Sequence, residues 1–167
     1  MRVLVTGAKG FVGRHLVDRL TADGFAVRAH VRAETSPSPW RQTPNSIATG
    51  DLRDKQAVQH MVRDMDAVVH CAARLRANSL DGFRQDNVAV TDLLAQTAIE
   101  EGVPRFVHLS SIAVYGLSSH QKTDEEAPMT PGRDGYAITK AEAEAALLKH
   151  EGLKTVILRA GFVWGGP

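Results

Sequence analysis

The sequence predicts a single α/β domain built on a doubly wound parallel sheet. Three observations indicate this fold class. Short apolar runs alternate with longer amphipathic segments along the chain, and a glycine-rich turn follows the first apolar run. The length of 167 residues, of which 43% are hydrophobic, suffices for one domain with a core and hardly for two.

The first βαβ unit spans residues 3–31. Residues 3–5 form an apolar run typical of a buried strand, residues 11–20 carry a helical pattern, and residues 25–31 form the second strand. Gly24 stands between the helix and the second strand, where a glycine commonly ends a helix. The chain therefore begins with a strand, a crossover helix and a parallel strand.

The same rhythm continues to residue 159. It predicts strands at 47–49, 67–71, 106–110 and 154–159, and helices at 54–63, 81–101 and 135–150. The last helix is rich in alanine, which has the highest helical propensity. Six strands joined by crossovers fit a doubly wound sheet.

Two stretches interrupt this rhythm. Residues 33–46 hold three prolines and few periodic apolar residues, and residues 117–133 are polar and contain Pro128 and Pro131. Both predict loops at the carboxyl ends of strands. Because open α/β sheets bind ligands at that edge, we expect both loops to lie near a binding site.

The composition limits the classes of partner. Lys and Arg number 20 against 19 for Asp and Glu, so no basic field predicts nucleic-acid binding, and a small molecule is the expected partner. Cys71 is the single cysteine, which excludes an internal disulfide, and seven histidines show no metal-binding spacing. No N-terminal apolar segment approaches the length of a signal sequence or a membrane span. These observations predict a cytoplasmic protein with no metal site and no membrane partner.

The glycines of the first turn predict a dinucleotide site. Gly7, Gly10 and Gly13 lie between the first predicted strand and the first predicted helix. Glycines allow the backbone to turn sharply and to approach a pyrophosphate, while the N-terminus of the following helix attracts its negative charge. This glycine spacing alone is a weak signal, but the strand before it and the helix after it are the context that supports it.

Tyr136 and Lys140 lie four residues apart near the start of the alanine-rich helix. This spacing puts both side chains on one helical face. A neighbouring ammonium favours the phenolate, so Lys140 would lower the pKa of Tyr136 from its ordinary value near ~10 and make it usable as a base. The same spacing is common on amphipathic helix surfaces, so this prediction depends on the motifs around it.

Seven motifs follow one another along the chain. They are Gly7-x-x-Gly10-x-x-Gly13, Gly50-Asp51-Leu52, His70-Cys71-Ala72-Ala73, Asn87-Val88, Ser110-Ser111-Ile112-Ala113-Val114-Tyr115-Gly116, Tyr136-x-x-x-Lys140 and Arg159-Ala160-Gly161. With these motifs the chain resembles the extended short-chain dehydrogenases/reductases of the NAD(P)-dependent epimerase/dehydratase family over nearly all its length. The resemblance implies a Rossmann fold and an NAD(P)-dependent enzyme.

The resemblance also implies three catalytic residues. Tyr136 would be the acid/base that exchanges a proton with a substrate hydroxyl while hydride moves to or from the nicotinamide. Lys140 would lower the pKa of Tyr136 and hydrogen-bond the nicotinamide ribose, and Ser111 would hydrogen-bond the substrate oxygen. Ser110 would support the end of the strand.

The cofactor contacts implied by the resemblance come from the strand ends and the first turn. Asp51 would accept a hydrogen bond from the adenine amino group beside Leu52, although a turn or helix-cap role explains an isolated Asp equally. The full set of implied cofactor residues is Gly7, Gly10, Phe11, Val12, Gly13, Arg32, Asp51, Leu52, Ala72, Ala73, Tyr136 and Lys140.

The end of the second strand predicts a preference for NADP over NAD. NAD enzymes usually place a carboxylate there for the ribose 2′-hydroxyl. This chain reads Val27-Arg28-Ala29-His30-Val31-Arg32, without a carboxylate. Arg32 suits a 2′-phosphate through charge-assisted hydrogen bonds. The alternative is that Arg32 is a solvated loop residue.

Residues 1–167 are expected to form one NAD(P)-binding Rossmann domain, with the C-terminal substrate lobe of the family largely absent. Either the sequence is a piece of a longer protein or the protein is naturally short. The leading functional hypothesis is an epimerase/dehydratase-type oxidoreductase that acts on a nucleotide sugar in its complete form. An NADP-dependent ketone or hydroxysteroid-like reductase and a non-catalytic dinucleotide-binding module are the alternatives. Residues 81–101 and 135–150 resemble the family's dimer-forming helices, so a homodimer is expected.

Overall fold

The fold was taken from a computed structural model, which describes residues 1–33, 39–116 and 123–165. Strands and helices alternate along the chain, as the sequence predicts. The elements are β1 (Arg2–Thr6), α1 (Phe11–Ala22), β2 (Ala26–Val31), β3 (Ser46–Thr49), α2 (Lys55–Val62), β4 (Ala67–His70), α3 (Leu80–Phe83), the π-helix η1 (Arg84–Ala89), α4 (Val90–Glu100), β5 (Arg105–Ser111), the 3₁₀ helix η2 (Ile112–Tyr115), α5 (Gly135–Leu147) and β6 (Lys154–Ala160).

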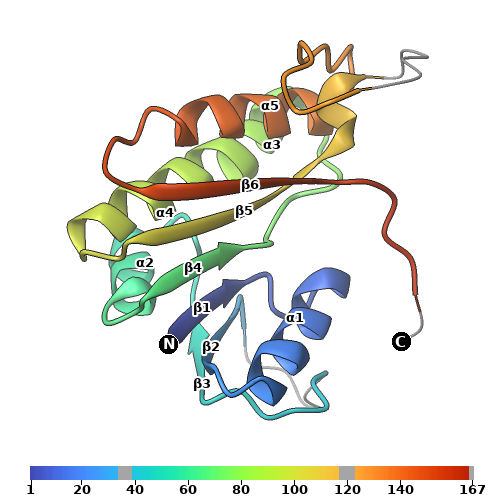
Figure 1. The fold of residues 1–167 in the computed structure, drawn as a ribbon. Helices are drawn as coiled ribbons and strands as arrows, with labels where there is room; N and C mark the ends of the chain where they lie inside the picture. The colour runs from blue at the N-terminus through green and yellow to red at the C-terminus, as the bar shows by residue number, and fades with distance from the viewer. Residues whose placement is uncertain (34–38, 117–122, 166–167) are drawn as a thin grey trace.

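The described strands form one parallel sheet in the order β3-β2-β1-β4-β5-β6. Figure 1 shows α1 on one face of this sheet and α2, α4 and α5 on the other. The strand order reverses between β1 and β4, which is where doubly wound sheets bind ligands. The predicted fold class is confirmed.

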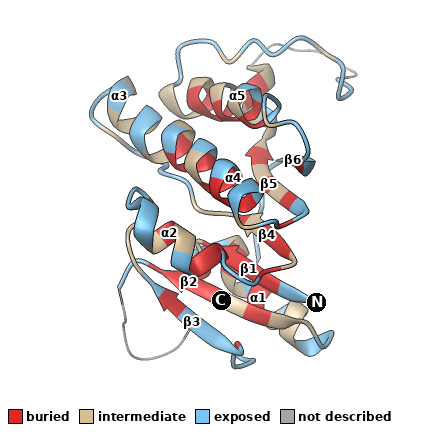
Figure 2. Ribbon diagram, turned by 90° about the vertical axis from the view of Figure 1, so that its left-hand side faces the viewer, coloured by how far each residue is buried: buried red, intermediate tan, exposed pale blue. Residues whose placement is uncertain are grey.

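Two hydrophobic clusters hold the helices to the two faces. Val3 and Val5 of β1 pack with Val17 of α1, whereas Leu4 packs with residues of α2 and α4 such as Met61 and Leu94. This alternation along β1 follows from the strand period of two. Figure 2 shows the buried residues concentrated in the strands and on the inner sides of the helices.

The outermost strand leaves part of one face open. Ile157 of β6 packs against the cluster under α4 and α5, so its neighbours Val156 and Leu158 face the opposite side. Both are about half exposed, at 52% and 49%. Beyond the strand, Phe162 and Trp164 are 90% and 84% exposed.

Residues 81–101, predicted as one helix, form three consecutive segments. Between α3 and α4 the backbone widens into the π-helix η1. Asn87 lies in this segment, is buried, and its side chain bonds both the backbone N–H and the backbone carbonyl of Arg74. Such π-segments frequently mark functional sites, and this one turns Asn87 toward the loop that follows β4.

Parts of both predicted loops, residues 34–38 and 117–122, lie outside the described residues, as do residues 166–167. The described end of the first loop packs beside the glycine-rich turn, since the Trp40 indole donates to the Ala8 carbonyl at 2.9 Å. Among the described helices, none combines the length and the apolar character needed to cross a membrane.

Candidate functional site

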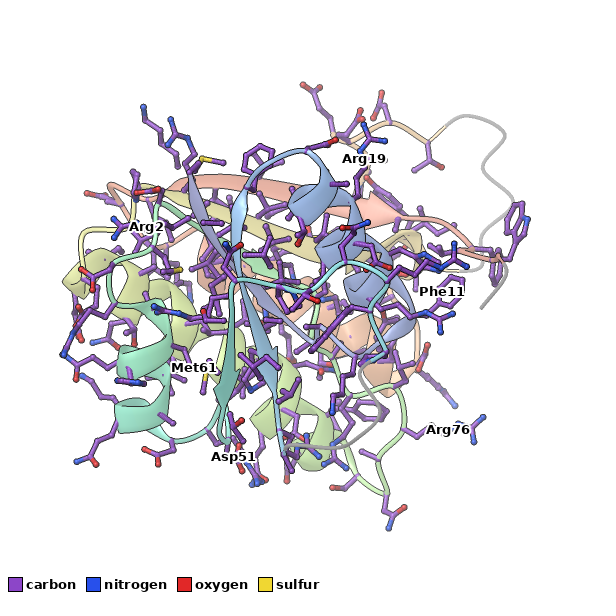
Figure 3. The ribbon with its side chains drawn as sticks, turned by 90° about the horizontal axis from the view of Figure 1, so that it is seen from below. Arg2, Phe11, Arg19, Asp51, Met61 and Arg76 are labelled. Carbon is purple, nitrogen blue, oxygen red and sulfur yellow. The ribbon has the colours of Figure 1, made fainter. Side chains whose placement is uncertain are left out.

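A cavity of about 660 Å³ lies at the carboxyl ends of β1, β2, β3 and β4. The glycine-rich turn, the ends of β2 and β3, and the loop after β4 form its walls. Its lining residues are Gly7, Lys9, Gly10, His30, Val31, Arg32, Ala33, Gly50, Asp51, Leu52, Arg53, Cys71, Ala72, Ala73, Arg74, Asp86 and Val90. In Figure 3, Asp51 and the loop that carries Arg76 lie along the same border of the molecule.

The glycine-rich turn brings the start of α1 against two strand ends. Gly7 has a φ of 67°, and a Cβ there would lie 2.7 Å from the Ala72 nitrogen. A Cβ on Gly13 would lie 2.2 Å from the Gly7 carbonyl oxygen. Only glycine fits at these two positions, because a side chain would push the helix away from the sheet.

The N-terminus of α1 has backbone donors that suit an anion. Within the described residues, no side chain caps this helix, its N-cap is Gly10, and its first turn holds no acidic residue. The first amides of a helix otherwise need an acceptor, and the helix dipole favours a negative one. Together with the close backbone approach at Gly7, this donor set fits the pyrophosphate of a dinucleotide.

Basic side chains line the cavity, and two of them form ion pairs with carboxylates that also line it. Arg53 forms an ion pair with Asp51 at 2.5 Å, which holds the Asp51 pKa at about 2. Arg74 forms an ion pair with Asp86. The expected role of Asp51 as an acceptor for adenine therefore competes with Arg53, a partner that the sequence motif did not reveal.

The end of β2 presents both His30 and Arg32 to the cavity. The His30 Nε2 atom lies 3.0 Å from the Gly50 carbonyl oxygen, which bridges the ends of β2 and β3. Burial lowers the pKa of His30. Arg32 is exposed and lines the same cavity, as its predicted role with the cofactor requires.

Ser111 and Tyr136 meet beside the start of α5. The side-chain interaction with Ser111 lowers the pKa of Tyr136, but burial raises it more, and the carboxylate of Asp134 adds to the rise. The net pKa of Tyr136 is therefore raised. The expectation that Lys140 lowers it is not met in this arrangement, because the ammonium bonds to strand β5 instead.

Lys140 is buried against β5. Its Nζ atom lies 2.9 Å from the His108 Nε2 atom and 2.7 Å from the Leu109 carbonyl oxygen. Burial lowers its pKa from an ordinary value of 10.5 to about 8, against the opposing effect of Glu144. The ammonium is thus a buried charge whose hydrogen-bond partners both come from one strand.

A second buried network lies one helical turn further along α5. Glu144 is fully buried, accepts hydrogen bonds from the Ser110 hydroxyl and the Arg159 guanidinium, and pairs with Arg159 at 2.8 Å. The Arg159 guanidinium also lies 5.0 Å from the ring centre of Tyr115. This network connects β5, β6 and α5, and it gives Ser110 the supporting position that the sequence predicts.

The structure divides the residues predicted from the sequence into two groups. Gly7, Gly10, Arg32, Asp51, Leu52, Ala72 and Ala73 line the cavity, whereas Phe11, Val12, Gly13, Ser111, Tyr136 and Lys140 do not. Phe11 is partly exposed and packs against Arg14 and His15. No role is predicted from the sequence for Arg53, Arg74 or His108, although Arg74 directly follows the Ala72-Ala73 motif and Arg53 directly follows Asp51-Leu52.

Comparison with known proteins places the chain in one family. The model of the NAD dependent epimerase/dehydratase family matches residues 3–166. The chain is 32% identical over 170 residues to a 4-hydroxy-2-methyl-3-oxo-4-farnesyl-3,4-dihydroquinoline-1-oxide ketoreductase of Stigmatella aurantiaca, covering 99% of this chain and 51% of that protein. It is 33% identical over 178 residues to a UDP-glucose 4-epimerase of Vibrio cholerae, covering 98% of this chain and 52% of that protein.

A solved structure shares the same architecture. The Bordetella bronchiseptica enzyme WbmH in complex with NAD⁺ superimposes with a TM-score of 0.83 at 27% identity, over 95% of this chain and 55% of that one. The chain therefore spans about half the length of the relatives that it matches.

Proposed function

The chain belongs to the NAD-dependent epimerase/dehydratase family, and we propose that it binds a pyridine dinucleotide in the cavity and oxidises or reduces a substrate beside Tyr136. The observation that carries the proposal is the start of α1, where close-packed glycines and uncapped amides among the described residues open into the cavity. Ser111 at the end of β5 and Tyr136 in α5 supply two neighbouring hydroxyl groups for the substrate oxygen. Binding and proton transfer are thus assigned to neighbouring parts of one sheet edge.

The bound dinucleotide would supply a hydride acceptor for oxidation and a hydride donor for reduction. In reduction, Tyr136 gives its phenolic proton to the substrate carbonyl oxygen, and Ser111 donates a hydrogen bond to the same oxygen. The raised pKa of Tyr136 keeps the phenol protonated at neutral pH, which is the form that reduction requires. In oxidation the phenolate form of Tyr136 accepts the proton of the substrate hydroxyl and becomes the phenol again.

A nucleotide sugar is the substrate class that we propose for the complete protein. The similarity to a UDP-glucose 4-epimerase supports this class. Transient oxidation of one sugar carbon would be followed by return of the hydride to the sugar, either directly or after an elimination, so the dinucleotide would be regenerated. Such an enzyme shows no net change in reduced nicotinamide during turnover.

A ketone or hydroxysteroid-like reductase is the second candidate. Two observations favour it: Arg32 replaces the carboxylate typical of NAD enzymes, and the chain is similar to a ketoreductase. A reductase would consume one NADPH for each ketone reduced. Following nicotinamide absorbance with the complete protein and each substrate class therefore separates the two candidates.

Replacement of Tyr136 by Phe tests the enzymatic assignment. We expect Tyr136→Phe to lower kcat by at least about a hundredfold, because the general acid is lost, while the dinucleotide Kd stays within about twofold. Steady-state assays and titration calorimetry on the complete protein measure the two quantities. Dinucleotide binding without turnover in the unmodified complete protein would instead favour a non-catalytic binding module.

Replacement of Arg32 tests the proposed NADP preference. Arg32→Ala should weaken NADPH binding about tenfold while changing NADH binding little, because it removes a charge-assisted bond to the 2′-phosphate. Arg76→Ala is the matched control, since Arg76 is exposed but does not line the cavity. An equal loss of affinity for NADPH and NADH would contradict the assignment. Arg32 would then contact a part of the dinucleotide that both cofactors share.

A homodimer formed through α4 and α5, and a cytoplasmic location, complete the proposal. Ile99 on α4 and Leu148 directly after α5 are apolar side chains that are 40% and 68% exposed. The single cysteine, Cys71, cannot form an internal disulfide, in keeping with a reducing compartment.

A further inference from the structure

A row of polar side chains crosses the sheet beneath the helices α2, α4 and α5. Thr6 of β1 lies opposite His70 of β4, and His70 lies opposite His108 of β5, with all three side chains buried. His70 is satisfied at both ring nitrogens, by Thr6 at 2.7 Å and by Thr91 at 3.1 Å. His108 differs, because only its Nε2 atom has a hydrogen-bond partner in the described part of the chain.

The Nδ1 atom of His108 is a buried polar atom without a partner among the described residues. A buried donor without an acceptor destabilises the folded chain, because it loses its hydrogen bond to water and gains none in return. An apolar ring at this position would fill the same space without that cost. A histidine at this position therefore needs another explanation, and its hydrogen bond with Lys140 supplies one.

The proton positions follow from burial. Burial lowers the pKa of His108, and the nearby charge of Lys140 lowers it further, so the imidazole stays neutral. The ammonium of Lys140 therefore donates to Nε2, and the ring proton resides on Nδ1. His108 and the Leu109 carbonyl together accept two of the three ammonium N–H bonds, which leaves one for another acceptor.

We propose that His108 is a positioning residue for Lys140. The His108 ring fixes the direction of the Lys140 ammonium and helps to keep it charged. The bond joins Lys140 on α5 to a residue 32 positions earlier on β5. The proposal rests on the dinucleotide binding proposed above and adds to it that the third ammonium N–H serves the ribose, the contact that the family resemblance implies for Lys140. A neutral imidazole is suited to this position, because it accepts a hydrogen bond without adding a second charge.

Other titratable groups around Lys140 cannot replace this acceptor. On α5, Glu144 favours the charged form of Lys140, but its oxygens bond Ser110 and Arg159. On the β4 side, Cys71 has its pKa raised to about 11 by burial, so the thiol is neutral at physiological pH. His70, also on β4, is held by Thr6 and Thr91, and Tyr136 interacts with Ser111.

The test measures the pKa of Lys140 by NMR on the 167-residue chain with isotope-labelled lysine, the signal being assigned with Lys140→Met. His108→Phe removes the acceptor and keeps a ring of similar size. We expect it to lower the pKa of Lys140 by about one unit or more, because a hydrogen bond to the charged form is lost. His108→Gln restores an acceptor near the Nε2 position and should keep the pKa within about half a unit of the original.

His70→Gln is the matched control, since His70 is equally buried on the adjacent strand and bonds to threonines rather than to Lys140. It should leave the Lys140 pKa unchanged. The ring nitrogen shifts of His108 in the unmodified chain should report the Nδ1–H tautomer at pH values below the pKa of Lys140. An unchanged Lys140 pKa in a folded His108→Phe variant, or an equal fall in all three variants, would overturn the proposal.

Titration with NADPH and NADH separates this proposal from the proposed function. If dinucleotide binds, the pH at which its affinity falls should move down in His108→Phe together with the Lys140 pKa. If neither dinucleotide binds at any pH while the NMR shift occurs, the proposed function is wrong and the coupling of His108 to Lys140 stands. If dinucleotide binds and its pH dependence is the same with Phe as with His, the positioning role is wrong.

Discussion

At the residue scale, the buried ammonium of Lys140 makes stability depend on pH. Its pKa is about 8 in the folded chain, and it returns to about 10.5 on unfolding. Between these values the unfolded chain binds a proton that the folded chain has released, so the contribution of Lys140 to the free energy of unfolding rises with pH. Below about pH 8 both states are protonated, and the burial cost is fully present.

Lys140→Met should remove this dependence. Relative to Lys140→Met, the unmodified chain should gain about 2.5 kcal/mol in the free energy of unfolding between about pH 7 and about pH 10. Urea unfolding at a series of pH values measures the difference. Lys149→Met is the control, because Lys149 is exposed. Its free energy of unfolding should change with pH in the same way as that of the unmodified chain. If the free energy of unfolding of Lys140→Met also follows that of the unmodified chain at every pH, the ammonium is not buried in solution.

At the element scale, the start of α5 couples helix capping to the chemistry of Tyr136. The Asp134 side chain accepts a hydrogen bond from the Tyr136 backbone N–H at 3.0 Å and caps the helix. The same carboxylate raises the pKa of the Tyr136 phenol. One side chain therefore stabilises the helix and adds to the rise that burial causes in the pKa of the phenol, and two substitutions separate these effects.

Asp134→Asn keeps a capping oxygen and removes the charge, so we expect a lower pKa for Tyr136 with little loss of stability. Asp134→Ala should lower the pKa similarly and also cost about 1 kcal/mol of unfolding free energy. Ultraviolet titration of the phenol, with Tyr136→Phe as reference, and urea unfolding measure the two effects. A Tyr136 pKa that is the same in both variants as in the unmodified chain would contradict the electrostatic coupling.

The π-helix inside the segment 81–101 is a feature that the sequence did not predict. The apolar and polar residues of this segment follow an ordinary helical period, and nothing in that pattern marks the π-turn at Arg84–Ala89. The widening accompanies a tertiary requirement, since Asn87 bonds the Arg74 backbone and the Thr139 hydroxyl. A local period cannot reveal a partner 52 residues away.

At the scale of the whole molecule, two exposed apolar surfaces compete as sites of association. One is the outward side of α4 and α5, and the other is the open face of β6 with Val156 and Leu158. The proposed homodimer uses the helices. Ala145 lies exposed on α5, and an Arg there keeps the helical propensity while placing a charge in the interface.

Ala145→Arg should therefore convert a dimer into a monomer of 18.1 kDa, as measured by sedimentation velocity. Val156→Arg places the same charge on the opposite face and should leave the dimer intact. The reverse result would assign the interface to β6, and a monomeric unmodified chain at all concentrations would exclude the dimer for these 167 residues.

The sheet could be predicted from the sequence because buried parallel strands are short apolar runs, as in Val3 to Val5, and the crossovers between them are amphipathic. The glycine-rich turn was predictable for a related reason, since Gly7 and Gly13 occupy positions where a Cβ would collide with backbone. The burial and the Asp134 carboxylate that raise the pKa of Tyr136 could not be predicted from the helical spacing alone. Helical spacing places Lys140 on the same face as Tyr136, but the contact with His108 depends on how α5 packs on β5.

The strand order also bears on how the chain folds as it is synthesised. In the order β3-β2-β1-β4-β5-β6, β1 forms the middle of the sheet and each later strand pairs with one that has already emerged. Each strand from β2 onward can thus pair as soon as it emerges, although one edge of β1 stays open until β4 is made, 64 residues after it. Every residue that lines the cavity precedes β5, whereas Ser111, Tyr136 and Lys140 emerge afterwards. A nascent chain can expose every residue that lines this cavity before any of its proposed catalytic residues has left the ribosome.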